Sequence, residues 1–279
     1  MSPLSAPVPN LTPHAAGEFL QSQVSTVVSQ TNGRLGPFLP GPNSNGRGAY
    51  CGDARELAQA LPDHCIDLIL TDPPYFRKDL PLYAWLAEEA PRLLSPGGFC
   101  LFMCGHLYLP EIYSYFTGQL RYYMTYAVFL KGQRTGVIWT VGPGNVRKAV
   151  IQRHKPILAY SNGPAVPRCG TVGLFTGTCQ DKRYHVQGQA MAPFRYYLDC
   201  FSWPGQVVLD PFCGGGTTPA MAKVTGRRWL AFDLDPEAVT TTQQRLADTT
   251  LPDEPLTQPD NARPQHPELD PLALQEALL

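Results

Sequence analysis

Apolar positions recur along the chain in two periods, one typical of strands and the other of helices. Short apolar runs predict strands at 48–53, 65–72, 99–105, 122–131, 155–161, 205–210 and 228–235. Apolar residues at helical spacing predict helices at 54–62, 80–95, 109–120, 219–226 and 236–249. Because the strands alternate with helices, we expect an α/β fold, with a doubly wound, mostly parallel sheet and helices on both of its faces.

The two ends of the chain differ from this pattern. Residues 1–46 and 249–279 are rich in proline and lack a sustained apolar period. We therefore expect a flexible arm at 1–46, one folded domain at 47–248 and a Pro-rich tail at 249–279. The full length of 279 residues suits one α/β domain with such appendages.

Composition excludes several classes of protein. No run approaches the roughly 18 to 20 apolar residues of a membrane span. The start, MSPLSAPVPN, lacks the basic region and apolar core of a signal peptide. The eight cysteines show no metal-binding spacing, so we expect reduced, buried thiols and no metal site. These features are typical of a cytoplasmic protein without a membrane anchor.

Positive charge is concentrated in the middle of the chain. Residues 121–195 hold eleven Lys and Arg against one acid, so the segment carries +10 while the whole chain carries −1. This excess favours a polyanion such as nucleic acid as the partner, over a merely solvated basic face. We expect phosphate contacts from Lys131, Arg134, Arg147, Lys148, Arg153 and Lys155.

The stretch TDPPY follows directly from the strand predicted at 65–72. Asp72 offers a carboxylate, Pro73 and Pro74 stiffen the backbone so that a carbonyl can be held in place, and Tyr75 offers a flat ring. Two hydrogen-bond acceptors beside a stacking surface suit the exocyclic amine of a planar base. The alternative is a strand-ending turn with a buried tyrosine, since Asp-Pro and Pro-Pro are common in turns.

A second strand ends in the stretch LDPFCGGGTT, where Asp210 precedes a glycine turn and a predicted helix. Glycines at such a turn let the backbone approach a ligand, and the helix that follows offers free N–H groups. The next strand ends in Asp233, where a carboxylate could accept hydrogen bonds from ribose hydroxyls. The two features together indicate a cofactor that contains a nucleoside.

Asp-Pro-Pro-Tyr and Phe-x-Gly-x-Gly, each at the end of a strand, resemble the motifs of S-adenosyl-L-methionine-dependent amino-methyltransferases that modify adenine N6 or cytosine N4 in DNA. The order of catalytic motif, basic segment and glycine motif is similar to that of the β-class. The resemblance covers 48–248. It implies a circularly permuted, seven-stranded, Rossmann-like methyltransferase sheet with a small DNA-recognition insertion at about 131–185.

The resemblance implies catalysis by Asp72, Pro73, Pro74 and Tyr75. Gln189 is the best match to a His-Pro-x-Gln-Lys-Pro element of the family, with Gln187 as the alternative, although the Lys-Pro is absent here. The implied cofactor, S-adenosyl-L-methionine, would contact Asp53, Asp72, Gln189, Asp210, Pro211, Phe212, Cys213, Gly214, Gly216, Thr217, Thr218, Asp233 and Leu234.

The implied partner is double-stranded DNA, and the implied origin is a bacterium, an archaeon or a phage. The recognition insertion is short, so we expect either a brief target site or help from a second subunit in a homodimer. A cognate restriction nuclease is a further partner that the resemblance allows.

Three alternative functions stay open. Asp rather than Ser before the two prolines favours adenine, and cytosine N4 is the alternative target. An RNA amino-methyltransferase would usually carry the glycine motif before the catalytic one. A nucleic-acid-binding protein with a decayed cofactor site would not be expected to keep both motifs intact.

Overall fold

The computed structural model describes residues 48–131, 136–141, 147–178 and 191–249. The predicted arm, all but the first residue of the predicted tail, and residues 179–190 lie outside these ranges. The domain boundaries predicted at 46 and 249 therefore remain predictions.

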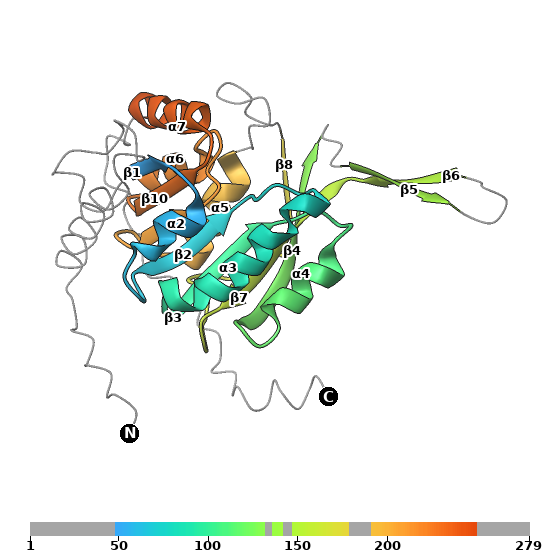
Figure 1. The fold of residues 1–279 in the computed structure, drawn as a ribbon, viewed down its shortest axis with the longest axis horizontal. Helices are drawn as coiled ribbons and strands as arrows, with labels where there is room; N and C mark the ends of the chain where they lie inside the picture. Colours follow the sequence, from blue (N-terminus) through green and yellow to red (C-terminus); the bar gives the residue numbers. More distant parts are fainter. Residues whose placement is uncertain (1–47, 132–135, 142–146, 179–190, 250–279) are drawn as a thin grey trace.

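Eight strands form one sheet in the order β1-β10-β9-β2-β3-β7-β4-β8 (Figure 1). Neighbours are parallel from β1 to β3 and between β4 and β8, whereas β7 is antiparallel to both β3 and β4. The strands are β1 (Gly48–Cys51), β2 (Ile66–Thr71), β3 (Leu94–Met103), β4 (Arg121–Lys131), β7 (His154–Ser161), β8 (Leu174–Thr178), β9 (Val207–Asp210) and β10 (Arg228–Asp233).

The predicted doubly wound, mostly parallel sheet is confirmed. The structure has eight strands in this sheet where the resemblance implied seven, and the additional one is β8 at the β4 edge. Its sequence, LFTGT, contains a glycine and two threonines and lacks the apolar run by which the other strands were identified.

Helices cover both faces of the sheet. On one face, side chains of α2 (Ala54–Gln59), α3 (Leu80–Leu93) and α4 (Leu109–Phe116) join a single buried cluster. On the other face, α5 (Met191–Phe201) and α6 (Thr217–Val224) join a second cluster, and α7 (Pro236–Asp248) packs beside them on β1 and β10. A short 3-10 helix, η1, spans Arg77–Asp79. Helix α5 was not predicted from the sequence.

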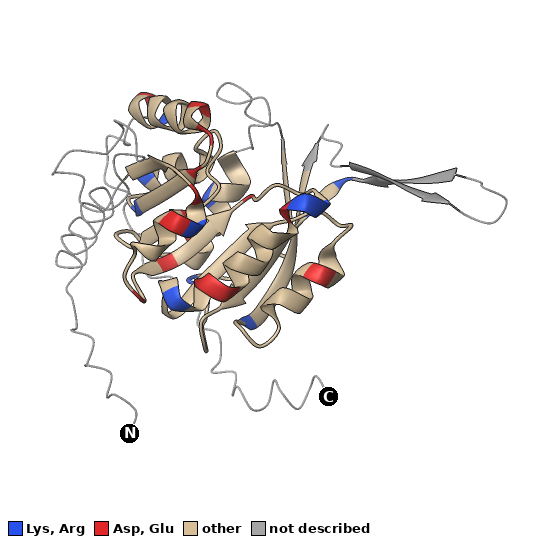
Figure 2. Ribbon diagram, viewed as in Figure 1, with Lys and Arg blue, Asp and Glu red and all other residues tan. Residues whose placement is uncertain are grey.

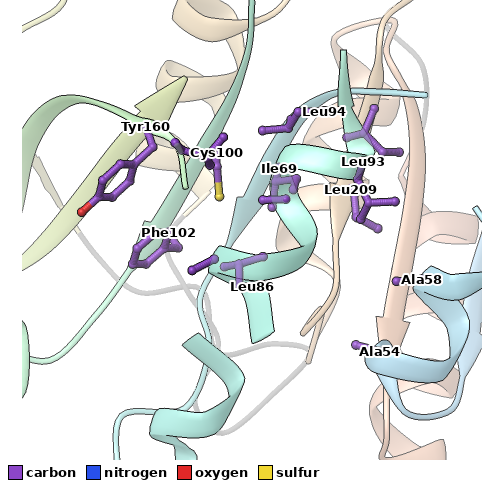
Figure 3. Packing of buried hydrophobic residues seen from close by; sticks show 14 of the residues in the cluster. Ala54, Ala58, Ile69, Leu86, Leu93, Leu94, Cys100, Phe102, Tyr160 and Leu209 are labelled. Atoms are coloured by element: carbon purple, nitrogen blue, oxygen red, sulfur yellow. The ribbon is translucent and has the colours of Figure 1, made fainter. Parts of the chain in front are cut away.

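The side chains of the central strands alternate between the two clusters. On β2, Ile69 faces the α3 side, whereas Leu68 and Leu70 face the α5 side, and all three are at most 1% exposed. Figure 3 shows Ile69 beside Leu209 of β9, and Leu86 of α3 close by. Strands buried on both faces in this way must be central, which explains why they read as continuous apolar runs.

A separate two-stranded hairpin projects from the sheet. Strands β5 (Gly136–Val141) and β6 (Arg147–Gln152) are antiparallel, and they lie in sequence between β4 and β7 (Figure 1). Neither strand was predicted. The hairpin falls within the segment 131–185 that was predicted to recognise DNA, and that role remains a prediction.

The ends of β2 and β9 are joined by side chains. The Thr71 hydroxyl donates a hydrogen bond to Asp210 Oδ1 at 2.6 Å, and the Thr218 hydroxyl of α6 donates to the Leu70 carbonyl at 3.2 Å. Asp210 is 4% exposed, and burial raises its pKa to about 7 in spite of the hydrogen bonds from Thr71, Thr218 and the Phe212 N–H. The pair thus fixes two strand ends that lie far apart in sequence.

The start of α6 lies very close to α7. Gly216, which caps α6, has a φ of +71°, and a Cβ added there would come within 2.7 Å of the Thr242 hydroxyl and 3.0 Å of its Cα. Gly214 has a φ of +48°, but a Cβ there would point into open space. The two glycines therefore serve different needs, since only Gly216 permits close packing of two helices.

Replacement of Gly216 tests this packing. We expect Gly216→Ala to lower the free energy of unfolding by about 2–4 kcal/mol, because left-handed strain adds to overpacking. The matched control, Gly214→Ala, carries the strain alone and should cost about 1–2 kcal/mol. Urea denaturation of both variants measures the difference. Equal losses would show that contact with Thr242 is unimportant.

The raised pKa of Asp210 predicts how stability depends on pH. The folded chain keeps a proton that the unfolded chain releases above about pH 4, so this contribution is present at low pH and is lost as pH rises to 7. Asp210→Asn retains an oxygen acceptor and cannot ionise. From pH 5 to pH 8, we expect wild type to lose on the order of 2 kcal/mol relative to the variant in urea denaturation. A pH-independent difference would contradict the raised pKa.

Candidate active site

The two sequence motifs meet at one corner of the sheet. Strand β2 leads into Asp72, and its parallel neighbour β9 leads into the glycine turn, with Leu68 opposite Val208 and Ile69 opposite Leu209. The hydrogen bond between the Thr71 and Asp210 side chains lies just past these paired residues. Carboxyl ends of adjacent parallel strands are where ligands bind in α/β sheets. The Asp-Pro-Pro-Tyr motif precedes the glycine motif in sequence, yet the strands that lead into them are neighbours.

The glycine turn is shaped by the strand that follows it. The Gly214 N–H donates to Asp233 Oδ2 at 2.8 Å, and the Cys213 N–H donates to the Phe232 carbonyl at 2.8 Å. Asp233 also accepts from the Asp235 N–H at 3.0 Å. A carboxylate has about four acceptor sites, so Asp233 retains capacity for ligand hydroxyls. Next to it, the Leu234 side chain is 72% exposed.

Asp53 lies just after strand β1, which is the neighbour of β10 in the sheet. Strand β1 pairs with β10 so that Cys51 is opposite Asp233, which brings Asp53 to the same edge of the sheet. Its side chain accepts from the Arg55 backbone N–H at 2.9 Å and pairs with the Arg55 guanidinium. These hydrogen bonds lower the pKa of Asp53, so it is an anion at neutral pH.

Other residues predicted to bind the cofactor hold the turn from within. Cys213, Thr217 and Thr218 are all at most 6% exposed. The Thr217 hydroxyl accepts from buried Arg245 at 2.9 Å, and the Phe212 ring packs edge-on against Trp85 at 6.0 Å. Their side chains therefore support the turn.

The Asp-Pro-Pro-Tyr segment forms a compact polar cluster. The Tyr75 hydroxyl donates to Asp72 Oδ1, and the Lys155 ammonium of β7 donates to Asp72 Oδ2 at 3.3 Å. The same ammonium lies 5.1 Å from the centre of the Tyr75 ring. Burial, followed by the nearby Asp72 carboxylate, raises the pKa of Tyr75 well above its ordinary value. Phe76, just beyond the motif, is 70% exposed.

The position of Lys155 was not expected. The charge pattern placed it among six candidates for phosphate contacts, whereas the structure places its ammonium against Asp72 of the Asp-Pro-Pro-Tyr motif, with 12% of its side chain exposed. Of the other five, Arg153 is exposed before β7, Lys131 ends β4, and Arg147 and Lys148 begin β6. Arg134, Gln187 and Gln189 lie outside the described residues. The phosphate contacts remain predictions.

Two further observations concern metals and membranes. Within the described ranges, no group of three or more His, Cys, Asp and Glu side chains could hold a metal ion, and all seven described cysteines are free thiols. Cys169 is exposed, whereas the other six are partly or fully buried. No helix in the described part of the chain has both the length and the apolar character to cross a membrane.

Comparison with known proteins supports the resemblance to DNA amino-methyltransferases. Residues 178–244, which include β9, α6 and β10, match the family described as DNA methylase, of the N6/N4 methyltransferase type. Among curated proteins, the type II methyltransferase M.BglII of Bacillus subtilis is 24% identical over 246 residues, which cover 71% of this chain and 68% of that protein.

Two solved structures share the fold. M1.HpyAVI, solved as a complex with SAM, superposes with a TM-score of 0.57 at 22% identity, covering 71% of this chain and 98% of that one. The cytosine-N4-specific PvuII DNA methyltransferase superposes with a TM-score of 0.61 at 16% identity, covering 74% and 88%. The family match and the curated relatives thus agree with the resemblance to amino-methyltransferases of the N6/N4 type, and the two solved structures share the fold.

Proposed function

We propose that the chain is an S-adenosyl-L-methionine-dependent DNA methyltransferase that transfers a methyl group to the exocyclic amine of a flipped base, with adenine N6 as the favoured target. The observation that best supports the proposal is that β2 and β9 are neighbours and end at the same corner of the sheet. There, Asp72 and Tyr75 follow one strand and the glycine turn follows its neighbour.

The cofactor fits the residues at this corner. Gly214 leaves open space where a side chain would otherwise stand, and Asp53 and Asp233 present carboxylates at the ends of β1 and β10. These groups would hold a nucleoside, with Asp233 accepting from ribose hydroxyls and exposed Leu234 offering an apolar contact. When bound, S-adenosyl-L-methionine supplies an electrophilic methyl group. M1.HpyAVI, a structural neighbour, was solved with SAM.

Asp72 and Pro73 would activate the acceptor. An exocyclic amine is a poor nucleophile because its lone pair is delocalised into the ring. Hydrogen bonds from its two N–H groups to the Asp72 carboxylate and the Pro73 carbonyl would favour a pyramidal nitrogen with a localised lone pair. The reaction needs no covalent link to the protein, so positioning and electrostatics would supply the rate.

Tyr75 would hold the base once it has left the duplex. Extrusion of a base costs a few kcal/mol, and stacking on an aromatic ring returns about 1–3 kcal/mol per base. The Tyr75 ring lies beside Asp72, to which its hydroxyl is bonded, so a stacked base would place its amine near the carboxylate.

The choice of DNA rests on the charge pattern and on the relatives. Along the ribbon of the described residues, positions of Lys and Arg are interspersed with positions of Asp and Glu (Figure 2). The net excess belongs to residues 121–195, which contain the projecting hairpin. Double-stranded DNA is therefore the proposed partner, and a cytoplasmic location is the corresponding proposal. The same proposal includes a second copy of the chain, in a homodimer, and a cognate restriction nuclease as partners.

Adenine is preferred over cytosine because Asp, rather than Ser, precedes the two prolines. A carboxylate is a stronger acceptor than a hydroxyl for the amine. The shared fold does not separate the two targets, since PvuII methyltransferase, one of the structural neighbours, is cytosine-N4-specific.

Labelled cofactor tests the function directly. The chain is incubated with S-adenosyl-L-methionine labelled in the methyl group and with duplex DNA or RNA, and the product is digested to nucleosides. We expect label in N6-methyl-2′-deoxyadenosine from DNA, and none with Asp72→Ala, which should leave cofactor binding largely intact in calorimetry. Label in N4-methyl-2′-deoxycytidine would change the target, and label only in RNA would refute the DNA proposal.

A series at Tyr75 separates stacking from hydrogen bonding. Tyr75→Ala should weaken productive base capture by about ten- to hundredfold in kcat/KM, whereas Tyr75→Trp and Tyr75→Phe keep a ring and should retain most of the activity. The phenylalanine variant loses only the hydroxyl that donates to Asp72. If all three variants lose activity equally, stacking is not the role of Tyr75. Steady-state kinetics on DNA provide the measurement.

A further inference from the structure

Lys155 is held against the catalytic motif by both of its side-chain contacts. Its ammonium lies 3.3 Å from Asp72 Oδ2, and it also lies 5.1 Å from the centre of the Tyr75 ring. The Lys155 and Asp72 side chains are only 12% and 14% exposed, so solvent and salt screen this pair far less than an ion pair on the surface. A lysine in this setting is poorly explained as a freely solvated charge.

The strand register fixes where the lysine side chain lies. Lys155 is paired with Val128 of β4, and on the other side of β7 the Cys104 N–H donates to the Pro156 carbonyl at 3.2 Å. His106, just beyond β3, donates from Nε2 to the His154 carbonyl at 2.9 Å. The backbone on each side of Lys155 is therefore bonded to β3 or its extension.

The face of the sheet follows from the same register. Side chains two residues apart on a strand point to the same side, so Lys155 shares a face with Ile157 and Ala159, which belong to the α5-side cluster. Tyr75 packs against that cluster as well. Gly105, two residues beyond the end of β3, lets the backbone run close to Tyr75, because a Cβ at Gly105 would lie 3.3 Å from Tyr75 Cβ. Lysine and tyrosine thus meet through rigid elements.

The two oxygens of Asp72 have different neighbours. Oδ1 accepts from the Tyr75 hydroxyl, and Oδ2 accepts from the Lys155 ammonium. A carboxylate bonded on both oxygens has a defined orientation.

We propose that Lys155 is a positioning residue for methyl transfer: its ammonium orients the Asp72 carboxylate for acceptance of the target amine. Lys155 does not touch the base or the DNA phosphates in this proposal. The inference rests on the proposed function, because it assigns a role within that same site.

The distinction from a phosphate contact can be measured. Loss of a phosphate contact weakens DNA binding across all sequences and reduces the slope of log K against log salt concentration by about 1. Loss of a positioning residue instead slows the chemical step at saturating DNA and leaves DNA affinity unchanged. A small displacement of a catalytic group is enough for a loss on the order of a hundredfold.

The experiment compares Lys155→Met, Lys155→Arg and Arg77→Met in the full chain. Arg77→Met is the matched control, since it removes an exposed cation five residues after Asp72 in sequence. For each protein, the methyl-transfer rate is measured in a single turnover at saturating DNA and cofactor. DNA affinity at several salt concentrations, cofactor affinity by calorimetry and thermal unfolding are measured on the same samples.

We expect Lys155→Met to lower the single-turnover rate by about ten- to hundredfold. Its DNA affinity, salt slope and cofactor affinity should stay within about twofold of wild type. Lys155→Arg should recover most of the rate, and Arg77→Met should match wild type. If Lys155→Met unfolds, the arginine variant decides: it retains the cation and must be active for the proposal to stand.

Several outcomes overturn the inference. An unchanged single-turnover rate in Lys155→Met does so, as does an equal loss in Arg77→Met. A reduced salt slope with a normal rate would return Lys155 to the phosphate contacts. If wild type methylates DNA and any one of these outcomes occurs, only the proposed role of Lys155 is refuted. A wild-type chain that methylates no nucleic acid refutes the proposed function, and the role of Lys155 with it.

Discussion

The hydrogen bond between Thr71 and Asp210 is the contact on which the rest of this site depends. It joins the ends of β2 and β9, and Thr218 adds a second link from α6 to the backbone of β2. The Asp-Pro-Pro-Tyr motif follows directly from β2 and the glycine turn follows directly from β9. The relative position of the two strands therefore sets the distance between the motif and the turn. The bond is buried, and it is therefore little affected by solvent or salt.

Two carboxylates near this corner have similar positions in sequence but different environments. Asp210 and Asp233 each end a strand and each precede a turn. Burial raises the pKa of Asp210 to about 7, whereas Asp233 is partly exposed and accepts backbone N–H groups from the turn. The first serves to join strands, and the second faces the side on which a ligand would bind. The family resemblance had assigned both to the cofactor.

The sequence predicted the strands that build the corner, because β2, β9 and β10 are buried on both faces and so read as apolar runs that end in an acid. It did not predict β5, β6, β8 or α5, which lack such a clear pattern. It also missed the contact between Lys155 and Asp72. Residues 83 positions apart meet only through the register of β7 against β3 and β4, and a shift of one residue would point the lysine to the other face.

The projecting hairpin has a consequence for how such chains diversify. Strand β4 leaves the sheet and β7 re-enters it as adjacent, paired strands, with Phe129 opposite His154. Leu130 and Lys131 still pair with β8, but among the described residues the hairpin strands β5 and β6 pair only with each other. A change in the length or sequence of the hairpin beyond Lys131 would therefore leave the register of the sheet unaltered.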